Sequence, residues 1–83
     1  MIPWIIRAEY VKDYRIHITF NDGVSGEIDF SNEFDGEIFE PLMNKAYFAS
    51  FHIEGHTLAW ENGADFAPEY LRALLGENVS AVR

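Results

Sequence analysis

The chain has 83 residues, of which 48% are hydrophobic and 16% aromatic, enough for one hydrophobic core and too few for two. Cysteine is absent, which excludes a disulfide framework, a thiolate nucleophile and a cysteine-ligated zinc. The 14 acidic side chains outnumber the 6 basic ones and give a net charge of −8; such a surface repels phosphate backbones and favours basic partners. We expect one domain over residues 1–83 that does not bind nucleic acid by itself.

The N-terminal segment MIPWIIRAEY is apolar for six residues and then meets Arg7 and Glu9, which is not the pattern of a signal peptide. No apolar run approaches the roughly 20 residues that a membrane span needs. The sequence therefore predicts a cytoplasmic protein without a membrane association.

The clearest local pattern is an alternation of apolar and polar residues over 15–30. Ile16, Ile18 and Phe20 alternate with polar neighbours, and the same period of two returns beyond the segment NDG. Asn, Asp and Gly tolerate the backbone of a tight turn, so the pattern predicts a β-hairpin. The β-branched and aromatic segment 4–11 predicts a strand before it, which gives a three-stranded antiparallel meander.

The middle of the chain is less regular. Residues 34–42 indicate an irregular connection with a turn at Asp35-Gly36, and residues 44–51 a short helix capped by Asn44. Residues 51–60 are typical of a second hairpin, which we expect to complete a single antiparallel sheet of about five strands.

The segment PEYLRALLG predicts a C-terminal helix on one face of the sheet. Pro68 suits its first position, Glu69 its positive end, and Gly76 its end. Residues 77–83 are expected to be a loose tail. The fold class is therefore α+β. The residues that we expect in the core are Ile16, Ile18, Phe20, Ile28, Leu58, Trp60, Leu71 and Leu74.

The segment HIEGH suggests a metal site, because His52 and His56 lie four residues apart with Glu54 between them. A metalloprotease requires H-E-x-x-H on a helix, whereas this glutamate is misplaced and Gly55 favours a turn. We expect no metal site and no other cofactor.

Three carboxylates, Glu61, Asp65 and Glu69, gather near the end of the second hairpin, where a carboxylate pair could act as general acid and base. Two of these three carboxylates also have a structural explanation in place of a catalytic one. Asp65 can accept N–H groups of the following turn, and Glu69 suits the start of a helix. Trp60 is expected in the core, with a ligand or interface role as the alternative. Without a serine–histidine arrangement or a glycine-rich phosphate loop, we expect no enzyme.

Three motifs carry a family resemblance: F-x-D-G at 20–23, FEPL at 39–42 and W-x-NGADFAPE at 60–69. In order and spacing they resemble the family catalogued as domain of unknown function 2442. The matching structural residues are Asp22, Gly23, Pro41, Trp60, Asn62, Gly63, Asp65 and Pro68. The chain departs from the pattern at 53–60, where a longer hairpin loop is expected, so no role is assigned to His56.

The resemblance implies a small bacterial protein with an antiparallel sheet, helices and no established activity. Similar members are often encoded beside a small partner and are proposed as antitoxins. In some longer relatives the module precedes a helix-turn-helix domain; this chain ends at Arg83, so we expect no DNA binding from it.

Two functional hypotheses follow. The first is a protein-interaction module, most concretely an antitoxin-like one, that binds a small basic toxin-like protein through acidic residues; self-association through an open sheet edge is a further option. The candidate partner-binding residues are Glu27, Asp29, Glu61 and Glu69. The alternative is a free-standing ligand-binding or regulatory domain with an aromatic groove between sheet and helix.

Overall fold

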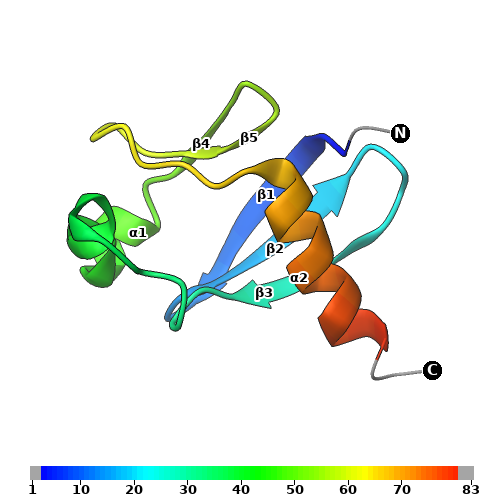
Figure 1. Ribbon diagram of the computed structural model, residues 1–83, viewed down its shortest axis with the longest axis horizontal. Coiled ribbons are helices and arrows are strands. Elements are labelled where there is room, and N and C mark those ends of the chain that lie inside the picture. The colour runs from blue at the N-terminus through cyan, green and yellow to red at the C-terminus, as the bar shows by residue number, and fades with distance from the viewer. Residues whose placement is uncertain (1–2, 81–83) are drawn as a thin grey trace.

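A three-stranded antiparallel sheet forms the centre of the computed structural model, which describes the backbone of residues 3–80 and the side chains of residues 3–75. Its strands are β1 (Ile5–Lys12), β2 (Arg15–Phe20) and β3 (Ser25–Asp29), in the order β1-β2-β3. Helix α2 crosses one face of this sheet (Figure 1). The α+β class and the meander are therefore confirmed.

The alternation in β2 explains why one face of the sheet is covered and the other open. Ile16, Ile18 and Phe20 are completely buried, while the residues between them face solvent with polar cross-strand neighbours. His17, for example, lies between Glu9 of β1 and Glu27 of β3. A period of two in the sequence thus becomes one apolar and one polar face.

The second hairpin consists of β4 (His52–Glu54) and β5 (Thr57–Ala59), and it forms a separate two-stranded sheet rather than extending the first into a single sheet. Its turn meets the first sheet where the Ile5 N–H donates to the His56 carbonyl at 2.9 Å. Leu58 is completely buried, so the hairpin still contributes to the common core.

The connection over 34–42 is more regular than the sequence indicates. Residues Glu37–Met43 form a 3-10 helix, η1, which contains Pro41. The predicted short helix follows as α1 (Lys45–Phe48), and its Asn44 cap is confirmed, because the side chain accepts the Tyr47 N–H.

Helix α2 spans Pro68–Ser80, so the prediction that Gly76 ends it is wrong. Residues 77–80 belong to the helix, and 81–83 lie outside the described residues. A single glycine weakens a helix by only about 1 kcal/mol relative to alanine, which does not end one by itself. Pro68 begins the helix as expected, and Leu71 and Leu75 are buried against the sheet.

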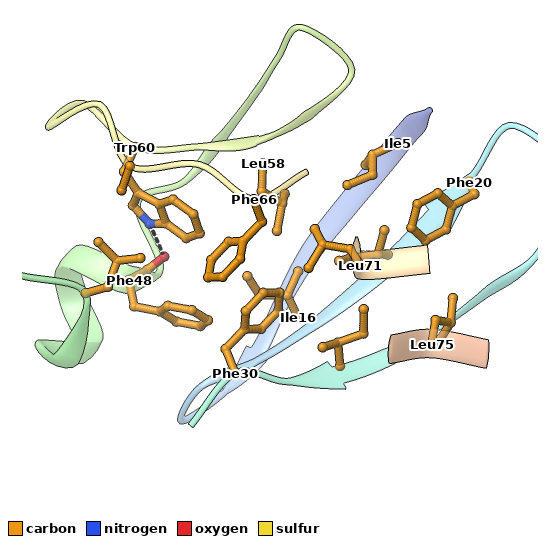
Figure 2. Close-up of a cluster of buried hydrophobic side chains, with 14 residues drawn as sticks. Ile5, Ile16, Phe20, Phe30, Phe48, Leu58, Trp60, Phe66, Leu71 and Leu75 are labelled. Atoms are coloured by element: carbon orange, nitrogen blue, oxygen red, sulfur yellow. Dashed lines mark hydrogen bonds between the residues drawn. The ribbon is translucent and has the colours of Figure 1, made fainter. Parts of the chain in front are cut away.

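Aromatic and aliphatic side chains together fill the core between the sheet, the hairpin and the helices (Figure 2). Trp60 is only 2% exposed, and its indole Nε1 donates to the Phe48 carbonyl oxygen at 2.9 Å. The Phe48 ring lies 5.9 Å from the Trp60 ring, and Phe66 meets Trp60 edge-on at 6.0 Å.

The predicted core is confirmed, except that Leu74 is only partly buried. The buried hydrophobic residues that the sequence prediction did not include are Ile5, Phe30, Leu42, Phe48, Ala64, Phe66 and Leu75.

Candidate functional site

The corner between β5 and α2 is built on a tight turn over residues 60–64. The Trp60 N–H donates to the Ala64 carbonyl at 2.9 Å, and the Gly63 N–H donates to the Trp60 carbonyl at 3.0 Å. Gly63 has a φ of 92°, a conformation that residues with a β-carbon adopt only with strain. This conformational demand accounts for the NG dipeptide at the turn.

Asn62 makes three hydrogen bonds, which close this turn and tie it to the rest of the molecule. Its Oδ1 accepts the Ala64 N–H at 3.0 Å, and its Nδ2 donates to the Ile38 carbonyl at 2.9 Å. Its backbone N–H donates to the Tyr47 hydroxyl at 3.0 Å, and the Gly63 N–H closes the turn beside it. The Asn62 side chain therefore connects the corner to η1, and the Asn62 backbone connects the corner to α1.

Asp65 does not have the structural role that the sequence suggests. It is exposed, and its carboxylate makes no hydrogen bond within the described part of the chain; its backbone forms an isolated bridge with Ala59. The residue that accepts the N–H of the turn is Asn62, three positions earlier. Asp65 is thus left free to face a cavity.

Replacing Asn62 by alanine is expected to destabilise the domain by about 1–2 kcal/mol, since two side-chain hydrogen bonds are lost. Asp65→Ala is the matched control and should change stability by no more than about 0.5 kcal/mol, as for an exposed residue without partners. Urea denaturation of both variants measures the difference. An Asp65 variant that loses as much stability as the Asn62 variant would restore the structural role to the carboxylate.

A cavity of about 380 Å³ lies beside this corner. One wall comes from the segment between β3 and η1 together with η1 itself, and the other from the segment that leads into α2. The lining residues are Asn32, Glu33, Asp35, Phe39, Asp65, Phe66, Ala67 and Tyr70.

The lining combines carboxylates with aromatic rings. Glu33, Asp35 and Asp65 supply three negative charges, and none of the eight lining residues is basic. Phe39 stacks on Phe66 with ring centroids 4.9 Å apart, and the Tyr70 hydroxyl donates to the Glu33 carboxylate. Carboxylates attract a cation, and the faces of aromatic rings add to that attraction, so the cavity suits an ammonium or guanidinium group.

The four predicted partner-binding acids do not line this cavity. Glu27 and Asp29 lie on the open face of β3, where Glu27 pairs with Arg15 at 3.0 Å and Asp29 lies 4.0 Å from the same guanidinium. The backbone N–H of Ser31 lowers the pKa of Asp29 by stabilising its charged form. Glu61 is exposed in the turn, and Glu69 is exposed in the first turn of α2.

The F-x-D-G motif has a structural explanation. Gly23 has a φ of 86° in the turn between β2 and β3, and the Asp22 carboxylate accepts the Val24 N–H at 3.1 Å. The pKa of Asp22 is lowered, chiefly by this Val24 bond and then by Arg72, which reaches the carboxylate from α2 at 3.1 Å. Asp22 therefore shapes the turn and ties it to the helix.

The histidines of the second hairpin are not brought together as metal ligands. The His52 Nε2 lies 2.9 Å from the Glu54 carboxylate, whereas the His56 ring stacks on Trp4 at 4.2 Å. Within the described residues no group of three histidine, cysteine or acidic side chains could hold a metal ion.

The sequence analysis missed four lining residues of the cavity: Asn32, Glu33, Asp35 and Tyr70. The segment 31–36 has no apolar period that would place it against the start of α2. The available signal was composition, because this segment carries two acids beside phenylalanines and without a basic residue.

Fold and cavity together define a small α+β domain with an acidic, aromatic-walled recess at its strand–helix corner. Residues 5–76 match the family described as "Protein of unknown function (DUF2442)", and the chain belongs to this family. No curated protein and no solved structure matches the chain. None of the described helices is long and apolar enough to cross a membrane.

Proposed function

We propose that this protein is a non-enzymatic, cytoplasmic interaction module that binds a basic protein partner, in the manner of an antitoxin that masks a small toxin-like protein. The observation that carries the proposal is the cavity at the corner, with three carboxylates, aromatic walls and no basic lining residue. A lysine or arginine side chain of the partner would be the anchor that enters it.

The anchor is favoured because the cavity offers a cation two kinds of stabilisation at once. Glu33, Asp35 and Asp65 supply charge-assisted hydrogen-bond acceptors, and Phe39 and Phe66 supply aromatic surface for the aliphatic stem of the side chain. A binding site that accepts one long basic side chain in a pocket resembles the centre of many interfaces, where a few anchors contribute most of the affinity.

The acids outside the cavity have a different proposed role. Glu27, Asp29, Glu61 and Glu69 are exposed, and with a net charge of −8 they would steer a basic partner toward the surface. Charges at the rim of an interface change the association rate more than the dissociation rate. Measurements of the association and dissociation rates should therefore separate the contribution of the cavity from that of the surrounding acids.

The test is co-expression with the product of the neighbouring reading frame, followed by co-purification and a growth assay. A cavity variant, Glu33→Gln with Asp35→Asn and Asp65→Asn, should raise the dissociation rate at least about tenfold, which is the change expected for roughly 1.4 kcal/mol of lost anchoring. The matched control, Glu27→Gln with Asp29→Asn and Glu69→Gln, removes the same charge and should mainly slow association.

Equal effects of the two triple variants on the dissociation rate would show that the cavity is not the anchor site. A wild-type protein that neither co-purifies with the partner nor changes growth would contradict the interaction module itself.

A second function has one observation in its favour. A volume of about 380 Å³ falls within the range of small-molecule pockets, roughly 300–1,000 Å³. On this alternative the chain is a free-standing ligand-binding or regulatory domain for an organic cation. Tight binding of a small amine, together with no partner protein, would favour this alternative.

A further inference from the structure

The outer edge of β1 carries an unusual amount of exposed apolar surface. Among the described residues, Trp4, Ile6, Tyr10 and Val11 are large hydrophobic side chains at least 39% exposed, and Ile6 reaches 61%. All four belong to β1 or directly precede it. Apolar residues concentrated on one edge strand are typical of a surface that another strand covers.

The backbone of this edge is also open. The Phe20 N–H donates to the Val24 carbonyl, so the backbone groups of Phe20 point toward β3. Successive residues of an antiparallel strand point their N–H and C=O groups to opposite sides, so those of His17 and Thr19 point toward β1. Their partners in β1 are Glu9 and Arg7, whose backbone groups point toward β2. The N–H and C=O groups of Ala8 and Tyr10 therefore point outward. Within residues 3–80 the outer edge of β1 makes one backbone hydrogen bond, from Ile5 to His56.

The charges beside Ala8 are self-complementary. Arg7 and Glu9 flank Ala8 on the open face of the sheet and form a pair 3.3 Å apart, with both side chains well exposed. If a second β1 strand runs antiparallel with Ala8 opposite Ala8, Arg7 of each copy lies opposite Glu9 of the other. The same register places Ile6 of one copy beside Tyr10 of the other.

We propose that the outer edge of β1 docks a second copy of this chain, with the two strands antiparallel and related by a two-fold axis at Ala8. The pairing joins the outward Ala8 groups of the two copies and covers Ile6 and Tyr10 on each side. It also arranges two arginines and two glutamates alternately on the open face. A second copy is the occupant because an antiparallel β1 strand presents the complementary charge order in this register, with Arg7 of each copy opposite Glu9 of the other.

The irregularities of β1 limit the size of this interface. The β1–β2 register shifts between Ile5 and Arg7 and again between Tyr10 and Lys12, and bulges of this kind interrupt strand addition. The regular stretch that can pair symmetrically about Ala8 is therefore Arg7 to Glu9, three residues from each copy. An interface this short forms a weak, reversible dimer rather than a permanent one.

The test is sedimentation equilibrium on the full chain at concentrations up to about 1 mM, where even weak association is populated. The wild-type protein should show a reversible monomer–dimer equilibrium. Arg7→Glu places like charges opposite each other twice and should weaken the dimer about tenfold. The double variant Arg7→Glu with Glu9→Arg restores the alternation and should return the dissociation constant to within about threefold of the wild-type value.

Ala8→Pro provides a second, backbone-based variant. The Ala8 N–H points away from β2, so proline should leave the β1–β2 ladder in place while removing a donor from the dimer. Circular dichroism should show an unchanged fold, and the dimer should be lost. A wild-type chain that stays monomeric at 1 mM overturns the proposal, and so does a dimer that none of these substitutions weakens.

Discussion

Replacing Trp60 by alanine is expected to remove about 3–5 kcal/mol of stability, the usual cost of deleting a large buried aromatic side chain. Trp60 is 2% exposed, contacts the Phe48, Phe51 and Phe66 rings and holds the Phe48 carbonyl through its indole N–H. A domain of this length has a total stability of roughly 4–12 kcal/mol. The variant should therefore be partly or largely unfolded at 37 °C.

Trp60→Phe separates packing from hydrogen bonding at this position. It keeps an aromatic ring but leaves the buried Phe48 carbonyl without its donor, and we expect a loss of about 1–3 kcal/mol. Thermal unfolding by circular dichroism measures both variants, at about 4–8 °C per kcal/mol for a domain of this size. Melting temperatures for both variants within 3 °C of the wild type would show that Trp60 is not the centre of the core.

The second large effect is expected at Gly26, where β3 meets α2. A β-carbon at this position would lie 2.5 Å from the Leu75 Cδ1, and Leu75 is 1% exposed and has little room to move. Gly26→Ala should therefore cost about 1–3 kcal/mol, the usual cost of overpacking a core. Urea denaturation gives this value directly.

A double-mutant cycle with Leu75→Ala identifies the cause. Leu75→Ala shortens the isobutyl side chain to a methyl group and so removes the Cδ1 atom that the new β-carbon meets. Gly26→Ala should therefore cost much less in the Leu75→Ala background than in the wild type. Equal costs in the two backgrounds would mean that the glycine is needed for its backbone and not for the close approach.

Local patterns allowed the central sheet to be predicted, because β2 is a strict alternation beside a turn sequence. The division into two sheets could not be predicted in the same way. Strands β4 and β5 have three residues each, too few for periodicity to show whether they extend a neighbouring strand. Gly76 misled the prediction because the residue type that commonly ends helices is also tolerated inside them.

The sequence predicted one of the two walls of the candidate site. The corner at 60–69 was found from its turn and helix-start residues, and Trp60 and Pro68 lie where they were expected. The opposite wall, at 32–39, depends on how an aperiodic segment packs after β3. Asp65 and Asn62 show the same limit: both can accept a turn N–H, and only three-dimensional geometry shows that Asn62 does so.

The position of Asn62 has a consequence for how the domain opens. Its hydrogen bonds reach the Ile38 carbonyl in η1 and the Tyr47 hydroxyl in α1, so neither of these short helices can detach without breaking a contact to the corner. Segments joined in this way open as one cooperative unit rather than by separate local fluctuations. We therefore expect the two walls of the cavity to open together, so that a ligand or partner side chain held between them would slow hydrogen exchange across all three segments.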